Sequence, residues 1–336
     1  MKVLQAFLAF LFAAVGFAQN LQGVVLDAGN TPLPGANVYF DNSSIATITD
    51  SEGNFSFVVN TKVNLSLVVS YVGYKTQYIQ DYDLGKKLIV VLEEEQNKLK
   101  EVTVTGNQLF SRKEKLKIFR EQFLGVSKAA RKAVIANEDD IYFVYDKSSN
   151  TLQGFADKPL IIENPYLGYQ ITYELVRFEL AFKKTSISSS DISSIFYSGY
   201  SRFEETGSDK EILQRREESY LGSTLHFFRS LASDSLFENK FVLYKEGLAR
   251  NPADCFVITD SDGMKNIKVN KVTAKDTEIF YNILYNDRER SRLTFKTDQF
   301  LIDYLGNYSS LERIFFLGEF GSKRVGNQLP LNYGIK

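Results

Sequence analysis

Cysteine, histidine and tryptophan are almost missing from this chain of 336 residues, which has one cysteine, one histidine and no tryptophan. A single cysteine, Cys255, cannot form an intramolecular disulfide, and its apolar neighbours in the sequence predict a small, buried strand residue. A single histidine excludes a zinc site of the carboxypeptidase type, which takes two histidines and a glutamate. The composition therefore excludes a disulfide scaffold and that zinc chemistry.

His226 is the one residue that could act as the base of a Ser-His-Asp triad. It stands between Leu225 and Phe227 in an apolar helical stretch, and this setting favours a packed structural histidine. Ser223 precedes it by three residues, but no nucleophile elbow surrounds that serine. Phosphate-binding glycine loops, EF-hands and Cys/His clusters are also missing. We expect no catalytic residue, no cofactor and no metal.

Charge of either sign is not in excess, because 40 Lys and Arg residues face 41 Asp and Glu residues. The basic residues form no long patch, so we expect no nucleic-acid partner. Adjacent carboxylates occur at Asp139–Asp140 and at Glu204–Glu205, and both pairs are interpreted as solvated strand ends. A polymer hydrolase would need two carboxyl groups about 5 to 10 Å apart, and this alternative stays open.

Residues 1–18 have the pattern of a secretory signal peptide. Lys2 gives a positive start, the stretch Ala6–Phe17 is apolar, and small residues precede the cleavage site expected after Ala18. The apolar run is shorter than the roughly 20 residues that span a bilayer. No cysteine stands directly after the cleavage site, where a lipoprotein would carry its acylated residue. We expect an exported protein of the periplasm or the outer-membrane periphery that is not a lipoprotein and whose mature chain has no transmembrane span.

Residues 20–95 predict a small β-sandwich, because short alternating strands recur with turn signals between them. Val24 and Leu26 alternate with polar or small residues, as do Phe55 and Phe57. Thr49–Asn54 predicts a turn in which Asp50 accepts hydrogen bonds from its own backbone and Gly53 adopts a positive φ.

Three segments of this stretch resemble the carboxypeptidase-regulatory-like domain, also called prealbumin-like or CNA-B-type. They are GVVLDAGNTPLPGANVYF, TITDSEGNFSFVV and LSLVVSYVGYKTQYI. The resemblance implies a seven-stranded β-sandwich. The same module stands at the N-terminus of many TonB-dependent receptors of the starch-utilisation (SusC) type in Gram-negative bacteria. It therefore implies a fold and a place in the cell envelope, but no activity.

Residues 96–108 are predicted to link two domains, after the polar run Glu93–Lys98. They include the one candidate interaction segment, whose residues are Glu101, Val102, Thr103, Val104, Thr105 and Gly106. Alternating Val and Thr favour an extended strand that can pair with another strand edge. The segment also resembles the stretch that leads into the plug of TonB-dependent receptors. A linker strand is the favoured interpretation, and a TonB box is the alternative.

Residues 109–336 predict a larger α+β domain with antiparallel sheet and a few helices. Ser111 and Glu114 have capping-box spacing, and the helix they begin has an apolar face and a solvated face that carries Lys113, Lys115, Lys117 and Arg120. A hairpin is expected from Ile141–Tyr145 and Leu152–Ala156, and one further helix from about Gln214 to Ser233.

This second part resembles the C-terminal region of an uncharacterised exported family of Gram-negative bacteria. The residues that carry the resemblance are Ile162–Asn164, Gly168–Tyr169, Ile171, Tyr173, Arg216, Tyr220, Gly222–Ser223, His226–Phe227, Arg229–Leu231 and Leu329–Tyr333. The resemblance implies no established activity.

Together these patterns predict a non-catalytic, exported binding protein of the cell envelope, accessory to outer-membrane uptake. The expected partner is an outer-membrane receptor or another envelope protein, or else a glycan or peptide. We expect binding by edge-strand pairing combined with aromatic contacts. A TonB-engaging receptor component and a polymer hydrolase are the alternatives.

Overall fold

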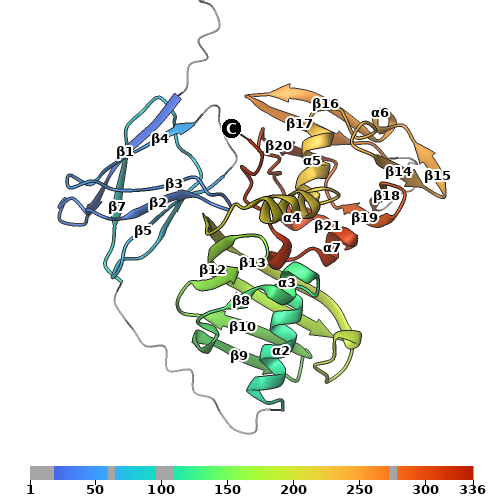
Figure 1. Cartoon of the computed structure of the whole chain (residues 1–336), viewed down its shortest axis with the longest axis horizontal. Helices are drawn as coiled ribbons and strands as arrows, with labels where there is room; N and C mark the ends of the chain where they lie inside the picture. The colour runs from blue at the N-terminus through green and yellow to red at the C-terminus, as the bar shows by residue number, and fades with distance from the viewer. Residues whose placement is uncertain (1–18, 60–64, 96–108, 272–277, 336) are drawn as a thin grey trace, which may run out of the picture. The chain divides into compact units, whose positions relative to one another are not determined.

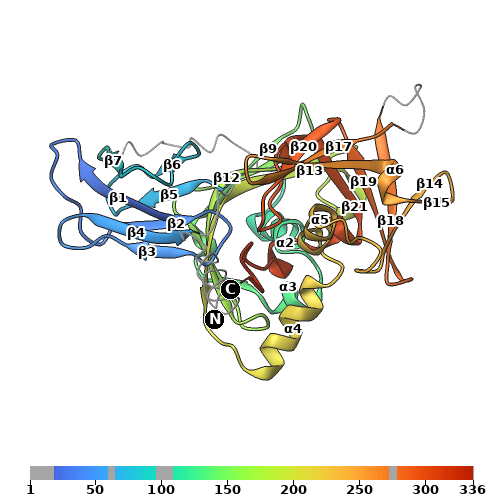
Figure 2. The same cartoon turned by 90° about the horizontal axis from the view of Figure 1, so that it is seen from above.

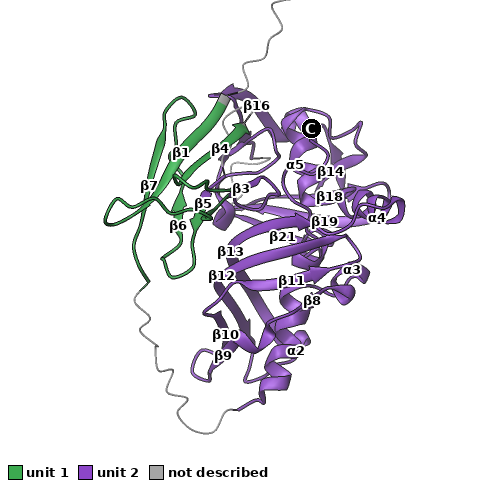
Figure 3. Cartoon of the chain, turned by 60° about the vertical axis from the view of Figure 1, so that its left-hand side comes forward, with its two compact units in different colours: residues 1–38, 47–62, 68–95 green, residues 39–46, 63–67, 96–336 purple. Residues whose placement is uncertain are grey.

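A computed structural model describes residues 19–59, 65–95, 109–271 and 278–335 (Figure 1). The fold is mainly β, with several antiparallel sheets and a few helices, as predicted. The signal peptide predicted for residues 1–18 and the linker predicted for 96–108 lie outside the described residues. The chain divides into two compact units (Figure 3). Residues 1–38, 47–62 and 68–95 make up the first unit, and residues 39–46, 63–67 and 96–336 the second.

The first seven strands form two sheets, which confirms the predicted seven-stranded sandwich. One sheet has the order β4-β1-β7, with β1 (Gln19–Asp27) between the antiparallel β4 (Asn54–Val59) and the parallel β7 (Leu88–Leu92). The other has the order β3-β2-β5-β6, and its strands are β2 (Asn37–Phe40), β3 (Ala46–Ile48), β5 (Leu67–Ser70) and β6 (Gln77–Ile79).

The turn before β4 forms as its sequence predicts. Asp50 Oδ1 accepts hydrogen bonds from the backbone N–H groups of Glu52 and Asn54, at 2.9 and 2.8 Å. The N–H of Asn54 is the main cause that lowers the pKa of Asp50. Gly53 has a φ of 74°, and a Cβ there would lie 2.6 Å from the carbonyl oxygen of Val25. Only glycine fits this position.

The second unit contains a six-stranded sheet built on β12 (Tyr169–Phe182). Along its whole length β12 pairs with β13 (Ile192–Glu205). Its other side pairs with β11 (Leu160–Asn164) and then with β10 (Thr151–Ala156). On that side the sheet ends in β8 (Val134–Ile135) and β9 (Ile141–Asp146), and on the other side it ends in β13. The predicted hairpin is therefore confirmed as β9 and β10.

A bulge bends the central pair of strands. Leu175 pairs with Gly199 and Arg177 with Ser198, so Val176 is an extra residue in β12. A Cβ on Gly199 would lie 2.3 Å from the carbonyl oxygen of Glu174, and glycine is therefore required where the two backbones approach.

Helices α2 (Arg112–Phe123) and α3 (Lys128–Lys132) lie on one side of this sheet (Figure 2). The predicted capping box is present, since Ser111 Oγ accepts from Glu114 N–H and the Glu114 carboxylate accepts from Ser111 N–H. Phe119 and Phe123 pack into the core with Phe178. The prediction that Lys115 is solvated is wrong, because only 3% of it is exposed. Lys115 precedes Phe119 by one helical turn, which places its aliphatic stem on the buried face.

A five-stranded sheet and a three-stranded sheet enclose a second core with α5 (Thr224–Ala232). The five-stranded sheet has the order β15-β14-β18-β19-β21, and its strands are β14 (Phe241–Lys245), β15 (Leu248–Arg250), β18 (Ile279–Tyr285), β19 (Glu289–Phe295) and β21 (Ile314–Gly318). The three-stranded sheet consists of β16 (Phe256–Ser261), β17 (Met264–Val269) and β20 (Gln299–Ile302). The remaining helical elements are α6 (Pro252–Cys255), α7 (Glu319–Ser322), η1 (Glu138–Asp140), η2 (Ser189–Asp191), η3 (Leu311–Arg313) and η4 (Val325–Asn327).

Two helical predictions need correction here. The single helix expected from Gln214 to Ser233 is two helices, α4 (Lys210–Tyr220) and α5, because Gly222 has a φ of 67° and Ser223 caps α5. Cys255 is buried as predicted, but it ends the short helix α6, which Asn251 caps, and β16 begins at the next residue.

Arg216 of α4 makes the densest set of buried polar contacts between these elements. Its guanidinium donates to the carbonyl oxygens of Leu167, Gly168 and Gly207 at 2.6 to 2.9 Å and pairs with the carboxylate of Glu205. Only 3% of the side chain is exposed. The group therefore holds α4 against the ends of β12 and β13.

We predict that Arg216→Met lowers the free energy of unfolding by about 3 kcal/mol or more, because three carbonyls and a carboxylate lose a charged donor. Arg215→Met is the matched control. Arg215 pairs with Glu211 one turn away on the helix surface, and such pairs contribute at most about 0.5 kcal/mol. Urea unfolding measures both variants, and equal destabilisation would contradict the role assigned to Arg216.

Candidate interaction site

The interaction segment Glu101–Gly106 lies outside the described residues and stays a prediction. The other candidates from the sequence lie among the described residues, as does the edge of the six-stranded sheet.

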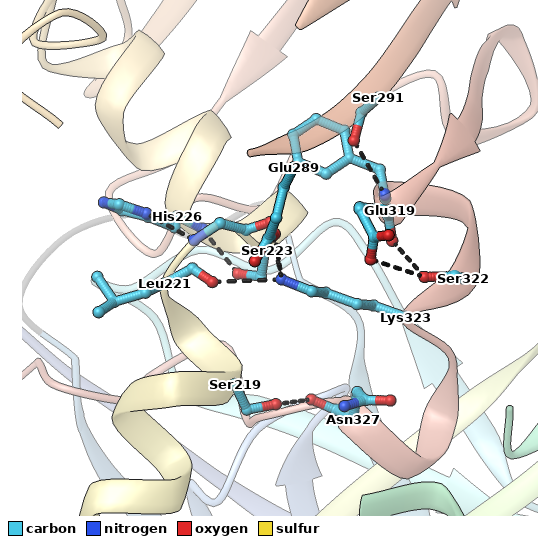
Figure 4. A network of polar contacts seen from close by, with 12 residues as sticks. Ser219, Leu221, Ser223, His226, Glu289, Ser291, Glu319, Ser322, Lys323 and Asn327 are labelled. Atoms are coloured by element: carbon cyan, nitrogen blue, oxygen red, sulfur yellow. Dashed lines mark hydrogen bonds and ion pairs between the residues drawn. The ribbon is translucent and has the colours of Figure 1, made fainter. Parts of the chain in front are cut away.

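His226 and Ser223 are part of a packed helix start (Figure 4). Ser223 Oγ accepts the backbone N–H of His226 at 3.1 Å and so caps α5. The His226 ring accepts the N–H of Gly222 at Nδ1, 3.2 Å away, and Nε2 lies 3.3 Å from Asn239 Oδ1. This network assigns the proton to Nε2. Burial lowers the pKa of His226, so the ring is neutral and packed, as predicted for a structural histidine.

Lys323 connects the C-terminal part of the second unit to the same turn (Figure 4). Its Nζ donates to the carbonyl oxygens of Leu221 and Gly222, at 3.2 and 3.0 Å, and lies 3.2 Å from Glu289 Oε2. Ser219 Oγ donates to the carbonyl oxygen of Asn327 at 2.8 Å. These contacts join the turn between α4 and α5 to the C-terminal part of the chain. The sequence carries no local signal for them, because the partners are about a hundred residues apart.

The adjacent carboxylates each face a cation. Asp139 lies 3.6 Å from Arg112, and Asp140 lies 3.3 Å from Lys158. Glu204 pairs with Arg202, and Glu205 pairs with Arg216. A hydrogen bond from Asn137 is the main cause that lowers the pKa of Asp140. Asp139 and Asp140 lie in η1, directly before β9, and Glu204 and Glu205 end β13, so each pair stands beside cations at one end of a strand.

A hollow of about 360 Å³ lies between α2 and α3. Its cationic lining residues are already engaged: Arg120 pairs with Glu138, and Arg131 donates to the carbonyl oxygen of Val126. Across residues 19–59, 65–95, 109–271 and 278–335, no group of three or more His, Cys, Asp or Glu side chains is arranged to hold a metal ion. Within the same ranges, no helix has the length and apolar character to cross a bilayer.

The outer edge of β9 is the feature of the second unit that best fits the predicted mode of binding. Strand β9 pairs with β10 on one side, and it ends the strand order of its sheet. The carbonyl of Ile141 points away from β10, because Arg112 Nη1 donates to it at 2.8 Å. Backbone groups of successive residues alternate in direction along an antiparallel strand. The N–H and C=O groups of Phe143 and Tyr145 therefore also point to the outer edge.

Aromatic and aliphatic side chains flank this edge on the solvent face of the sheet. The rings of Tyr142 and Phe155 stack with centroids 5.2 Å apart, and Val144 is 41% exposed. Tyr142 and Val144 alternate with Phe143 and Tyr145, which pack towards the core. The edge thus offers main-chain donors and acceptors beside a small apolar surface, the combination that strand addition uses. The sequence predicted this hairpin but not which of its sides is open.

Asp41 is a second feature that sequence reasoning missed, and it belongs to the second unit. Its Oδ1 accepts the N–H of Ser201 in β13 at 2.7 Å, and its own N–H donates to the carbonyl oxygen of Ser66. Loss of solvation on burial raises the pKa of Asp41 to about 7. The sequence could not show this, because the partner strand is 160 residues away.

Comparison with known proteins identifies the N-terminal module. Residues 21–104 match the family model of the CarboxypepD_reg-like domain, which confirms the resemblance drawn from its three segments. Over 108 residues the chain is 34% identical to the TonB-dependent receptor SusC of Bacteroides thetaiotaomicron, covering 31% of this chain and 10% of the receptor. Over 100 residues it is 31% identical to the TonB-dependent receptor P39 of Formosa agariphila, covering 30% of this chain and 9% of the receptor.

The chain thus spans about a tenth of the length of the curated relatives it matches. The similarity lies in the N-terminal region, and it indicates an envelope-associated, receptor-related protein. The family match ends at residue 104, so the resemblance stated for residues 109–336 stays a prediction.

We predict that Asp41→Asn becomes more stabilising, relative to the wild type, by roughly 1–3 kcal/mol between pH 5 and pH 8. A group whose folded-state pKa is raised contributes stability that is complete below its ordinary pKa and is lost as the pH rises through about 7. Urea unfolding of the variant and the wild type across this range measures the difference.

Asp50→Asn is the control for this pH dependence, because the pKa of Asp50 is lowered instead of raised. It should not become stabilising at pH 8. A stability difference for Asp41→Asn that stays constant from pH 5 to pH 8 would contradict a raised pKa at Asp41.

Proposed function

We propose that this chain is a non-catalytic interaction protein of the cell envelope that binds an extended segment of another envelope protein at the outer edge of β9. The observation that carries the proposal is the outward direction of the Phe143 and Tyr145 backbone groups beside the stacked rings of Tyr142 and Phe155. An added strand would satisfy up to four hydrogen-bonding groups there. Each such bond contributes roughly 0.5–1.5 kcal/mol net, so binding at this edge alone is weak and reversible.

The N-terminal module supports an envelope partner. TonB-dependent receptors carry a similar region at 31–34% identity, and the apolar leader predicted from residues 1–18 would export the chain to the same compartment. We infer that the first unit associates with the envelope, while the second unit presents the β9 edge. The expected partner is an outer-membrane receptor or a protein that works with one.

The middle of β9 lacks two features that commonly protect exposed edge strands. The strand contains no proline, and its central residues, Tyr142 to Tyr145, carry no charge. Edge strands often carry one of these features, which prevents unwanted pairing. Their absence from the middle of β9 is consistent with an edge that is reserved for a partner.

We predict that a photoreactive phenylalanine analogue at position 144 crosslinks the mature protein to a defined envelope protein in producing cells. The same analogue at position 257 is the matched control, because Val257 is a similarly exposed valine on β16, the outer strand of another sheet. Val144 is 41% exposed and Val257 is 45% exposed. Adducts that appear equally at both positions, or at position 257 alone, would contradict binding at β9.

A charge substitution tests the same contact, since an added lysine on an edge strand opposes strand addition. In a protein that carries the photoreactive analogue at position 155, Val144→Lys should reduce adduct formation severalfold. In the same protein, Val257→Lys should leave adduct formation unchanged.

A further inference from the structure

The five-stranded sheet of the second unit has a solvent face of unusual composition. Its inward residues are buried against α5 and the three-stranded sheet, and the alternate residues point the other way. The strand register places these outward residues in three rows across the sheet. The rows are Val242, Leu284 and Arg290; then Ala249, Tyr244, Asn282, Arg292 and Leu317; and then Phe280, Thr294 and Phe315. We call this set the outer rows.

Seven of these eleven residues are apolar and two are arginines, and none is acidic. Phe315 and Leu317 are exposed to 44% and 59%, and Arg290 and Arg292 are exposed as well. A solvent-facing sheet surface is normally polar. Large apolar side chains exposed side by side on a described surface therefore call for a partner.

Cations lie over two rings of the outer rows. The Arg292 guanidinium lies 4.8 Å from the centre of the Phe280 ring, and Nζ of Lys245, a buried residue, lies 3.6 Å from it. Lys296 Nζ lies 4.9 Å from the centre of the Phe315 ring. Arg292 uses Nε to donate to Asn282 Oδ1 at 2.9 Å, which directs the guanidinium along the sheet surface. The face thus combines positive charge with exposed apolar side chains. It is complementary to a surface that has both anionic groups and a hydrophobic layer.

We propose that the outer rows dock on the anionic headgroup surface of a phospholipid bilayer. Phe315 and Leu317 enter the boundary between headgroups and acyl chains, as apolar side chains of interfacial proteins do. Arg290, Arg292 and Lys296 contact phosphate groups, and arginine binds phosphate oxygens through two parallel hydrogen bonds. The cations already stacked on Phe280 and Phe315 keep their charge while their rings are buried.

The shape of the face distinguishes a bilayer from a peptide partner. Peptides are usually held at a strand edge, in a helix-lined groove or in an aromatic-lined groove. The outer rows instead run across the whole face of a sheet, from β15 to β21. A broad, shallow surface of this kind fits an extended planar partner. This site is separate from the β9 edge, so either proposal can fail without the other.

Sedimentation with lipid vesicles tests the proposal on the whole mature protein. It should sediment with phosphatidylcholine vesicles that contain phosphatidylglycerol and remain in solution with vesicles of phosphatidylcholine alone. Each Lys or Arg near an anionic surface contributes a factor of about five to binding. The double variant Arg290→Gln with Arg292→Gln should therefore bind roughly twentyfold more weakly. The double variant Phe315→Ser with Leu317→Ser should also lose binding to the vesicles that contain phosphatidylglycerol.

Matched variants keep the same change in net charge or apolarity at a different place. Lys113→Gln with Lys117→Gln removes two exposed cations from α2, and Leu213→Ser removes an exposed leucine from α4. Both should bind vesicles like the wild type. An equal loss for the α2 variant would show a net-charge effect and overturn the proposal. So would a wild type that ignores anionic vesicles, or one that binds a glutamate-rich peptide through these arginines instead.

Discussion

The pairing of β12 with β13 is the interaction on which the second unit depends. These two strands of fourteen residues pair along their length with two register shifts, and Gly199 makes room for the backbone at the first. Because β13 occupies one whole side of β12, β10 and β11 must share the other side, and their partners β9 and β8 end the sheet on that side. The open edge of β9 is therefore a consequence of the topology, and the hairpin sequence alone does not determine it.

Buried and partly buried cations hold this arrangement together by donating hydrogen bonds to backbone carbonyls. Arg216 donates to carbonyl oxygens in the turns at the ends of β12 and β13. Arg229 donates to the carbonyl oxygens of Leu305, Leu331 and Tyr333. Lys323 donates to two carbonyl oxygens in the turn between α4 and α5. Each removes a carbonyl from water while supplying a charged donor, so the cost of burying the charge is offset by several hydrogen bonds. The role of these three cations is structural, and their contacts make up a large part of the polar contacts between the elements of the second unit.

The two candidate interaction surfaces, by contrast, lie on a sheet edge and on a sheet face. The β9 edge joins open main-chain groups to stacked rings, and the outer rows join cations to apolar side chains. Both arrangements suit partners that are themselves extended, a strand in one case and a bilayer in the other. Together with an N-terminal module that resembles the same region of TonB-dependent receptors, they support the proposal that this protein connects envelope components.

Local signals in the sequence were sufficient for the elements that local contacts decide. The Asp50 turn, the Ser111 capping box and the β9–β10 hairpin all form as predicted, since their partners lie within a few residues. Features that depend on distant partners were not accessible. The break at Gly222 is set by Tyr285, whose ring would contact any Cβ there, and the pKa of Asp41 depends on its burial against β13. The outer rows exist only because five strands adopt one register.

Hydrogen exchange of the β9 amides in the isolated mature protein tests the open edge most directly. The account predicts alternation along the strand. The amides of Phe143 and Tyr145 should exchange at least about tenfold faster than that of Val144, which faces Gln153 in β10. Uniform protection of all three amides would show that the outer edge is already covered, and would contradict the account.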